Sequence, residues 1–399
     1  LWQRRHDVTV DEADHRIGGH TATVDVTLQG QSYAVDTGFI VYNDRTYPNF
    51  IRLLDELGVS SQPTDMSFAV RNVTSGLEYA GSNINTLFGQ RRNALRPSFL
   101  RMLADIVRFN RDAQRDLDDG VLSPSTTLRE YLATKQYSAL FASDYLVPMG
   151  AAIWSCGTDT IWQFPIHFFL QFFRNHGLLD IQNRPQWYVL QGGSRSYLAP
   201  LTAGFSGSIR TDCAVEQVQR NSRGVNVIAR GGQCEEYDQV VFACHSDQAL
   251  NILDDASSAE RDILGAIAYQ PNDVILHTDS SVLPSRQRVW SSWNAVVDGS
   301  LSQLPQLTYN MNILQGIDAP ETFCVTLNQN EDIDPAKILR RFCYSHPVFS
   351  LAGSAAQARW QEINGLQRSW FCGAYWHNGF HEDGCWSGVR VANGLGISW

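Results

Sequence analysis

A carboxylate and a glycine pair near the start of the chain could together bind a nucleotide. Residues 8–10 form a short β run, Glu12 follows it, and Gly18 and Gly19 come six and seven residues later. In a βαβ nucleotide-binding unit the second strand ends in a carboxylate that accepts hydrogen bonds from ribose hydroxyls. A glycine pair lets the backbone pass close to a bulky ligand, because neither position carries a Cβ. The same residues also fit an ordinary strand followed by a glycine turn, so the pattern alone leaves both interpretations open.

Longer segments of the sequence resemble a known protein family. Residues 7–20, DVTVDEADHRIGGH, resemble the second strand and glycine pair of the FAD-dependent amine oxidase and phytoene desaturase superfamily. The resemblance runs nearly end to end and is to one bacterial branch of the superfamily, usually described as predicted NAD/FAD-binding oxidoreductases. The segments that carry it are VDTGFIVYNDRTYPN (35–49), PMGAAIWSCG (148–157), NHGLL (175–179), QGGSRSYL (191–198), WSSWN (290–294) and GAYWHNGFHEDG (373–384).

The resemblance implies an α/β fold with two interleaved domains. One is a Rossmann-like FAD-binding domain, and the other is an α+β substrate domain of helices and an antiparallel sheet. A chain of 399 residues exceeds the usual size of one domain, which agrees with two. The expected division is 1–65, 187–268 and 368–399 for FAD, and 66–186 and 269–367 for substrate.

The resemblance also assigns residues to the cofactor. The implied FAD-binding set is Glu12, Ala13, Arg16, Gly18, Gly19, Gly38, Val215, Ala243, Gly373, Glu382, Asp383 and Gly384. Gly38 is expected against the flavin, Val215 against the adenine, and Ala243 at a strand end beside the cofactor. A helix that begins near Glu382 would point its free N–H groups and positive dipole end at the flavin pyrimidine. Val215 is equally explained as a core residue, and Asp383 as a plain helix N-cap.

Aromatic residues are the candidates for the substrate pocket. The run 148–173 is too aromatic for a solvated loop, and core packing explains any single ring better than a pocket does. Some rings should still line a cavity, since ligand cavities are built from such residues. The candidates are Tyr42, Trp154, Trp293, Asn294, Tyr375 and Trp376. No acid, base or nucleophile is assigned, because the cofactor supplies the chemistry of flavin reduction.

One departure from the family concerns the pyrophosphate. Members of the superfamily begin with a hydrophobic strand and a GxGxxG turn, whose N–H groups hold the FAD pyrophosphate. The 399 residues contain no such turn, and Leu1 to Arg5 look like the last turn of the helix that follows it. The resemblance therefore implies that the first strand is missing, that about 20 residues precede this start in the family, and that this chain by itself binds FAD poorly.

Composition narrows the partners. The net charge of −10 argues against nucleic acid, because phosphate binding needs a basic surface. The eight cysteines form no CxxC pair and suggest reduced, buried thiols in a cytoplasmic protein, with neither a disulfide framework nor a metal site. No apolar run approaches the roughly 18 residues of a membrane span, and no signal-peptide pattern is present.

Hydrophobic periodicity predicts the main elements. Two hairpins are expected, one from strands 21–28 and 31–38 and one from strands 213–219 and 224–230. A pair of short strands is expected within 66–79, a continuous buried strand at 237–244 and a further strand at 368–375. An antiparallel sheet is expected from strands 273–279, 287–294, 306–312 and 322–328. Helices are expected at 47–58, 98–116, 126–134 and 137–146, after 193, and at the C-terminal end.

A basic segment at 82–115 suggests a second kind of contact. It carries seven arginines and two aspartates, a charge of +5 in a protein of −10. Helical spacing places Leu100, Leu103, Ile106 and Val107 on one face and Arg101, Arg108, Arg111 and Arg115 largely on the other, with Phe99 and Phe109 near the boundary. Such a helix can lie on an anionic membrane, or its apolar stripe can pack on the core while the arginines are solvated. The sequence leaves both open.

These observations predict an FAD-dependent oxidoreductase that takes a hydride from a C–H bond of an apolar or amine-bearing small molecule. The chain has only two lysines, Lys135 and Lys337, and none between 277 and 312, where many amine oxidases carry one near the flavin. This speaks against amine oxidation. A desaturase or isomerase acting on a lipid-like substrate is the alternative enzyme, and a non-catalytic remnant without FAD is the alternative outside enzymes.

Overall fold

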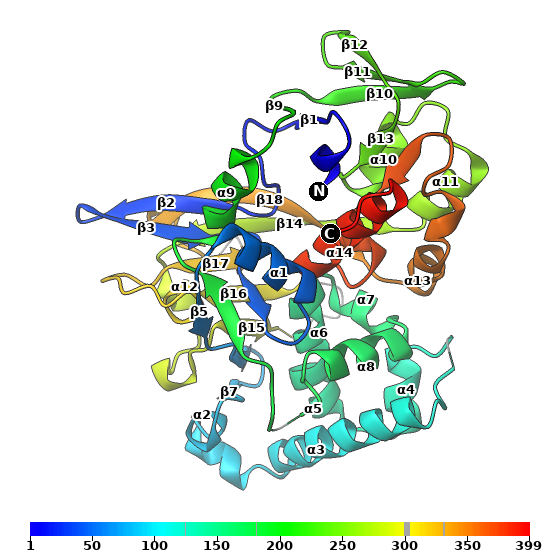
Figure 1. Ribbon diagram of the computed structural model, residues 1–399. Coiled ribbons are helices and arrows are strands. Elements are labelled where there is room, and N and C mark those ends of the chain that lie inside the picture. Colours follow the sequence, from blue (N-terminus) through cyan, green and yellow to red (C-terminus); the bar gives the residue numbers. More distant parts are fainter. Residues whose placement is uncertain (124, 181, 299–303, 330–331) are drawn as a thin grey trace.

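The computed structural model describes residues 1–399 apart from 124, 181, 299–303 and 330–331. An α/β part that contains both chain termini lies at the top of Figure 1, a large sheet crosses the middle, and a layer of helices closes the bottom. The α/β fold class expected from the sequence is confirmed.

The α/β part is built on two short parallel strand pairs. They are β1 (Thr9–Asp11) with β9 (Ser208–Arg210), and β13 (Val240–Phe242) with β19 (Ser369–Phe371). A three-stranded antiparallel sheet of β10 (Val215–Arg220), β11 (Val225–Ala229) and β12 (Cys234–Tyr237) lies beside them. The expected continuous buried strand at 237–244 is reduced to β13, and Val240 and Val241 are only half-buried. Within the described residues β13 has a partner strand on one edge, β19, while its side chains border a cavity.

Helices lie around these strands in this part of the molecule. They are α1 (Pro48–Leu57), α9 (Leu198–Ala203), α10 (Ser246–Ile252), α11 (Ser258–Gly265), α13 (Leu351–Ala358) and α14 (His381–Gly394). The helix expected at 47–58 is confirmed as α1, which buries Phe50 and Leu54 and ends at Gly58 with φ of 66°. In Figure 1, α1 and α14 lie next to each other.

A seven-stranded sheet forms the middle layer. Its order is β18 (Ile338–Val348), β14 (Ala268–His277), β17 (Cys324–Leu327), β16 (Gln306–Asn310), β15 (Trp293–Val297), β6 (Phe68–Asn72) and β7 (Leu77–Ala80). The strands expected as an antiparallel sheet do pair antiparallel, and β6, which runs parallel to β15, extends that sheet. The expected strand 287–294 is largely wrong, since Gln287–Val289 is a 3₁₀ turn and β15 starts only at Trp293. The long β18 was not predicted, because its exposed Arg340 and Arg341 break the apolar alternation.

Two smaller sheets complete the strands. The predicted hairpin is confirmed as β2 (Thr23–Leu28) and β3 (Gln31–Asp36). The third sheet joins β4 (Val41–Asn43), β8 (Trp187–Leu190) and β5 (Ser61–Thr64). Eight 3₁₀ turns lie between the main elements: η1 (Trp2–Arg4), η2 (Arg91–Leu95), η4 (Ser194–Tyr197), η5 (Ser280–Val282), η6 (Gln287–Val289), η7 (Pro335–Lys337), η8 (Trp360–Glu362) and η9 (Ala374–Trp376).

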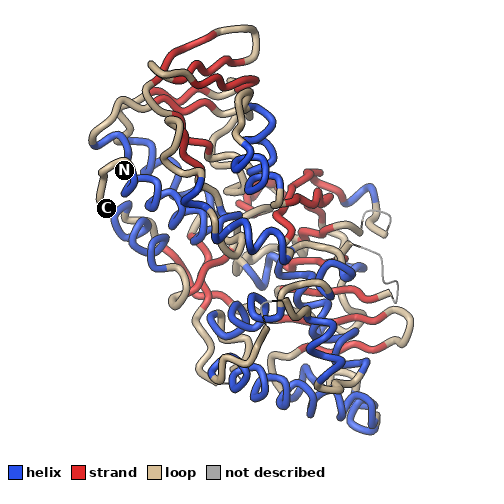
Figure 2. Tube along the Cα trace, turned by 90° about the vertical axis from the view of Figure 1, so that its right-hand side faces the viewer, coloured by secondary structure: helices blue, strands red, loops and turns tan. Residues whose placement is uncertain are grey.

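The lower layer is helical, as predicted. It contains α2 (Ile84–Leu87), α3 (Pro97–Asp118), α4 (Leu128–Thr134), α5 (Ala139–Phe141), the π-helical turn η3 (Ala142–Leu146), α6 (Val147–Trp154), α7 (Thr158–Trp162) and α8 (Ile166–Asn175); the short α12 (Met311–Leu314) belongs to the sheet layer. Figure 2 shows this layer at the lower right. The expected boundary position of Phe99 and Phe109 is wrong: both are buried in the core with Met102.

The cysteines differ in part from the expectation of burial. Cys156, Cys324 and Cys372 are buried, whereas Cys234 and Cys343 are exposed because they alternate outward on β12 and β18. Among the described helices, none is both long and apolar enough to cross a lipid bilayer.

Candidate cofactor and substrate site

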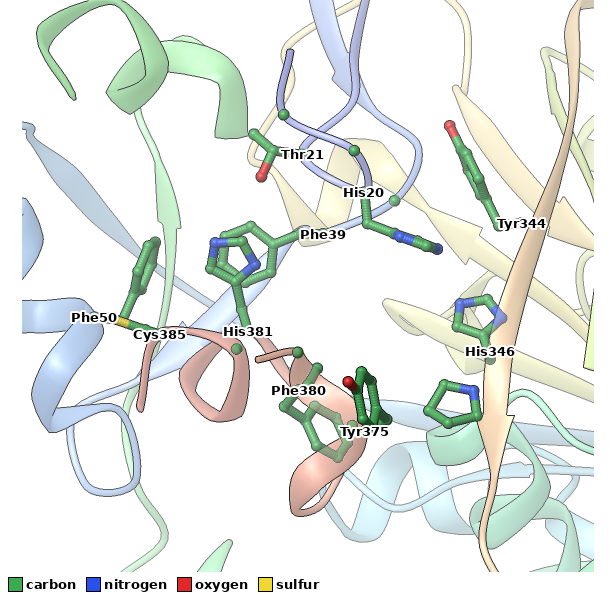
Figure 3. Close-up of a pocket in the computed structure, with 18 of the residues that line it drawn as sticks. His20, Thr21, Phe39, Phe50, Tyr344, His346, Tyr375, Phe380, His381 and Cys385 are labelled. Atoms are coloured by element: carbon green, nitrogen blue, oxygen red, sulfur yellow. The ribbon is translucent and has the colours of Figure 1, made fainter. Parts of the chain in front are cut away.

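One cavity of about 2670 Å³ runs from the α/β part into the helical layer. Its walls include Glu12 after β1, Ala243 after β13 and Gly373 after β19. In open α/β sheets, ligands bind at the carboxyl ends of parallel strands, which is where these residues lie. Figure 3 shows a close-up of this cavity with some of its lining residues, among them His20, His346 and His381.

The structure brings most of the predicted site residues to this cavity. Those on its walls are Glu12, Ala13, Arg16, Gly18, Gly19, Gly38, Val215, Ala243, Gly373 and Gly384 from the cofactor set, and Trp293 and Tyr375 from the substrate set. They come from segments more than 370 residues apart in the chain.

The glycine-pair loop is held by Arg16. Its guanidinium donates to the carbonyl oxygen of Gly19 at 2.8 Å and to that of Thr21 at 3.1 Å. Both glycines have positive φ, 111° for Gly18 and 53° for Gly19. A Cβ on Gly19 would meet nothing within 4 Å, so this position opens onto free space at the cavity wall. Arg16 thus shapes the loop and leaves its surface to a ligand.

Gly38 is required by a backbone contact rather than by open space. A Cβ at this position would lie 2.2 Å from the carbonyl oxygen of His20. That oxygen also accepts a hydrogen bond from the N–H of Phe39 at 2.6 Å. The close approach locks the glycine-pair loop against the strand hairpin.

Glu12 keeps an acceptor available at the end of β1. One carboxylate oxygen accepts from the N–H of Asp14 at 2.9 Å. The neighbouring Arg210 pairs with Asp11 at 2.7 Å and with Glu235 at 2.5 Å, and the described residues contain no ion pair to Glu12. The second oxygen can therefore accept hydrogen bonds from a ligand.

The N-terminus of α14 faces the cavity through its backbone. His381, Gly384 and Cys385 line the wall, and the N–H groups of His381 and Glu382 have no hydrogen-bond acceptor among the described residues. Free N–H groups at a helix start bind negative charge. A Cβ on Gly384 would contact only Ala374, at 3.9 Å or more.

The two carboxylates of this helix start do not line the cavity. Glu382 turns toward α1 and accepts from the N–H groups of Asn49 at 3.1 Å and Phe50 at 2.9 Å. Burial raises its pKa. Asp383 accepts from the N–H of Phe380 at 2.8 Å. Asp383 is thus not the N-cap residue, which is Phe380, but the third residue of α14, and its side chain reaches back to the N-cap. Glu382 joins the start of α14 to α1.

Four predicted substrate residues lie elsewhere. Tyr42 donates to Ser61 at 2.6 Å in the cluster under α1. Trp154 is a core residue whose ring lies 4.7 Å from that of Phe172, and Trp376 is buried in the α/β core. The side-chain amide of Asn294 donates hydrogen bonds to the carbonyl oxygens of Ser291 and Thr308. Aromatic or polar type alone does not separate core from cavity.

A group of histidines in the cavity was not found from the sequence. The His20 ring lies 5.6 Å from His346, 6.0 Å from His245 and 5.2 Å from Tyr344. Figure 3 shows His20 pointing from its loop toward β18, where His346 lies. Burial lowers the pKa of His20 to about 4 and that of His346 to about 3, so both are neutral at pH 7. These residues are scattered along the chain, and no spacing signal connects them.

The far end of the cavity is apolar. It is bounded by α2, α3 and α6 and by the strand pair β6 and β7, and its wall includes Phe68, Tyr79, Leu87, Leu103, Ile106, Val107, Tyr145, Met149 and Ile153. We call this part the apolar arm. Neither lysine of the chain lines the cavity: Lys135 pairs with Asp116 at 2.6 Å and Lys337 with Asp279 at 3.2 Å.

Comparison of the sequence with known protein families identifies the family of this chain. The family model for flavin-containing amine oxidoreductases matches residues 1–314. The chain belongs to this family. It is thus an FAD-dependent oxidoreductase, which confirms the predicted family, cofactor and enzyme class. No curated protein sequence matches the chain.

Solved structures share the fold across both chains. A putrescine oxidase bound to putrescine aligns with a TM-score of 0.66 over 97% of this chain and 92% of its own, at 14% identity. A cyclohexylamine oxidase from Brevibacterium oxydans gives 0.64 over 97% and 93%, also at 14% identity. A fatty acid isomerase from P. acnes that produces CLA gives 0.65 over 96% and 92%, again at 14% identity. At this identity the likeness shows the fold and not the substrate.

The residues present fit the ribose and flavin parts of FAD. A cavity of this size at strand ends, an available Glu12 oxygen, the open space at Gly19 and the free N–H groups of α14 each suit one part of the cofactor. The pyrophosphate is the exception, because the sequence holds no GxGxxG turn.

Proposed function

We propose that this family member removes a hydride from a C–H bond of an apolar small molecule. The observation that carries the proposal is the continuity of the cavity, which joins the cofactor-facing residues to the apolar arm without a break. FAD, when bound, supplies the hydride acceptor. The chain would hold the cofactor through Glu12, the Gly18–Gly19 loop and the start of α14, and it would orient the substrate by the shape of the arm.

The composition of the arm supports an apolar substrate. Its aliphatic and aromatic side chains offer contact area and exclude water, while the lysines are tied to carboxylates away from it. A carboxylate is needed to bind an ammonium group in a dry site. Asp65 is on the cavity wall, but its side chain is exposed to solvent and therefore does not form a dry site for an ammonium group. The arm thus supports a hydrocarbon substrate more than an amine.

A lipid-type isomerase or desaturase is the second candidate. The same apolar arm favours it, and a fatty acid isomerase shares the fold. All of these reactions begin with removal of hydrogen from carbon, so they differ in the product rather than in the first step.

Two measurements test the proposal. First, the purified chain is titrated with FAD, and visible absorbance and quenching of flavin fluorescence report binding. Second, the loaded protein is mixed anaerobically with unsaturated fatty acids and with primary amines, and loss of flavin absorbance reports hydride removal. Bleaching by fatty acids supports the proposal, and bleaching by amines alone contradicts it. No FAD binding, even with FAD in large excess, would leave the non-catalytic remnant as the correct reading.

A further inference from the structure

Apolar side chains are unusually exposed where α2, η2 and the first half of α3 meet the solvent. The exposed fraction is 77% for Ile84, 86% for Leu95, 44% for Leu100 and 55% for Val107. Leu100 and Val107 are seven residues apart on α3 and so lie on the same side of the helix. We call Ile84, Leu95, Leu100 and Val107, with the arginines between them, the α2–α3 surface. The stripe expected to pack on the core thus reaches solvent at its two ends.

The arginines of this surface are not neutralised. In the described part of the chain, Arg91, Arg92, Arg96 and Arg101 form no ion pair with a carboxylate. Arg91 donates to the side-chain oxygen of Asn85 and Arg92 to the carbonyl of Gly76. This leaves four positive charges among the exposed apolar tips, in a protein whose net charge is −10.

The second half of α3 provides an internal contrast. Arg108 pairs with Asp105 at 2.8 Å, Arg111 with Asp112 at 3.6 Å, and Arg115 with Asp116 at 3.3 Å. The second half of α3 therefore carries paired arginines, whereas Arg101 in its first half and the arginines just before the helix form no ion pair in the described part of the chain. General solubility would not require this difference along one helix.

The α2–α3 surface also borders the apolar arm. Ser82 and Leu87, on either side of the start of α2, line the cavity, and so do Leu103, Ile106 and Val107 of α3. Val107 is both exposed and on the cavity wall, so the arm comes to the protein surface at this place.

We propose that the α2–α3 surface docks onto an anionic lipid membrane and that apolar substrates enter the arm from that membrane. Separate apolar tips among unpaired arginines suit a bilayer, where the tips enter the interface and the arginines meet lipid phosphates. A second copy of this acidic chain or a folded protein would need a continuous complementary patch, which this surface lacks. The entry step rests on the proposed function, whereas the docking step does not.

The docking test uses the whole chain and vesicles. Binding to neutral phosphatidylcholine vesicles is compared with binding to vesicles that contain phosphatidylglycerol, by flotation at low and high salt. We expect binding to the anionic vesicles alone, and a steep loss of it as salt screens the charges. Each arginine near an anionic surface contributes roughly fivefold in affinity. The triple variant Arg91→Glu, Arg92→Glu and Arg101→Glu should therefore bind at least 100-fold more weakly.

A matched control reverses three arginines elsewhere. Arg261, Arg340 and Arg341 are also exposed, and β18, which carries the last two, lies at the opposite edge of the large sheet from β7. The change of net charge is the same in both triple variants, so only a local surface distinguishes them. Equal binding by the two variants, or equal recovery with neutral and anionic vesicles, overturns the docking proposal. Dimer formation lost in the first variant alone would assign the surface to a second copy instead.

The apolar tips are tested separately. Ile84→Ser with Leu95→Ser should keep the salt-dependent attraction and lower vesicle affinity about tenfold, since two exposed side chains no longer enter the interface. Thermal unfolding checks that every variant is folded. Vesicle binding is measured without turnover. No binding of the wild-type chain to anionic vesicles therefore overturns docking alone, while docking without flavin bleaching overturns only the proposed function.

Discussion

The two ends of the cavity are built in different ways. At the cofactor end, backbone groups and single polar contacts define the wall: the Gly38 approach to the His20 carbonyl, the Arg16 clamp and the free N–H groups of α14. At the other end, the described wall of the apolar arm consists mainly of aliphatic and aromatic side chains. The first kind of site recognises one ligand by placed hydrogen bonds, whereas the second accepts many ligands of similar shape.

This difference explains why the cofactor is better defined than the substrate. Where two backbone segments approach closely, only glycine fits, because any other residue would add a Cβ. A glycine at such a position in the sequence therefore indicates the backbone contact. A leucine in an aliphatic wall can become methionine or isoleucine at little cost, so its presence carries almost none. The histidine cluster also lines the cavity, and burial keeps the rings of His20 and His346 neutral at pH 7.

The largest effect should come from adding a pyrophosphate-binding turn to the cofactor end. The parallel pairs β1–β9 and β13–β19 both border the cavity, and the described residues place no strand between them. A variant with a β-strand and a GxGxxG turn joined in front of residue 1 should bind FAD at least 100-fold more tightly. Two or more N–H groups on the pyrophosphate would each contribute about 1.5 to 3 kcal/mol. Equilibrium titration measures it, and a strand without the glycines is the control. Equal FAD affinity of the chain with and without the added glycine turn would contradict this prediction.

Gly38→Ala tests the rigidity of the cofactor end. The added Cβ would meet the His20 carbonyl at 2.2 Å, so backbone must move, and we expect a loss of about 3 kcal/mol in the free energy of unfolding. Gly19→Ala is the control, because its Cβ meets nothing within 4 Å and only its φ of 53° is unfavourable, which costs about 1 kcal/mol. Urea denaturation measures both. Similar losses for the two variants would mean that the loop is not held against Gly38.

Glu12→Gln removes charge from the cofactor end without changing its shape. FAD affinity should fall by about 1.5 to 3 kcal/mol, since a charged acceptor for ribose hydroxyls becomes neutral. The fold should be unaffected, because the described residues hold no ion pair to Glu12. Asp14→Asn changes a nearby carboxylate by the same chemistry and should leave the affinity within a factor of about two. An unchanged dissociation constant for Glu12→Gln would make this residue only a strand end.

Much of the fold followed from the sequence, and particular residues show why the rest did not. The hairpin β2–β3 and helix α1 are determined by local alternation and by the stop at Gly58, so they were predicted. Strand β18 was missed because its pairing with β14, 70 residues away, overrides a polar local pattern. Glu382 was assigned to the cofactor because its position near a helix start is visible in the sequence, whereas its contact with Asn49 and Phe50 is not. Trp154 lies in the core and Trp293 lines the cavity, yet both are tryptophans in aromatic segments, so only the three-dimensional structure distinguishes their roles.

The histidine cluster of His20, His245 and His346 should make the free energy of unfolding depend on pH. The folded pKa values of His20, about 4, and His346, about 3, lie below the unfolded value of about 6.5. The unfolded chain therefore binds more protons between these values, and stability present above pH 6.5 is lost as pH falls toward 4. Around His20 lie His245, Tyr344 and Arg16. Asp36, whose pKa burial raises to about 6, acts in the opposite direction, so the test is a difference between variants.

His346→Asn should flatten the loss of stability between pH 7.5 and 5. We expect a difference on the order of 1 kcal/mol from the wild-type chain, measured by urea denaturation at the two pH values. His15→Asn is the control, because the side chain of His15 is 77% exposed. The cluster has no such role if both variants follow the wild-type pH profile.

The smallest effect should come from the apolar arm, because many side chains share the contact there. Ile106 is half-buried on α3 and lines the arm. Ile106→Gln places an amide on this wall, and the affinity for a neutral apolar dye such as Nile red should fall about three- to tenfold, the loss expected for one or two buried methylene groups. Val121→Gln is the control, since Val121 is 67% exposed and does not border the cavity. FAD affinity should stay the same in both variants, because the Glu12 end of the cavity is proposed to bind the cofactor and the arm is proposed to bind the substrate. A loss of FAD affinity in Ile106→Gln, with dye binding unchanged, would mean that the two ends are not separate in function and that α3 supports the cofactor end.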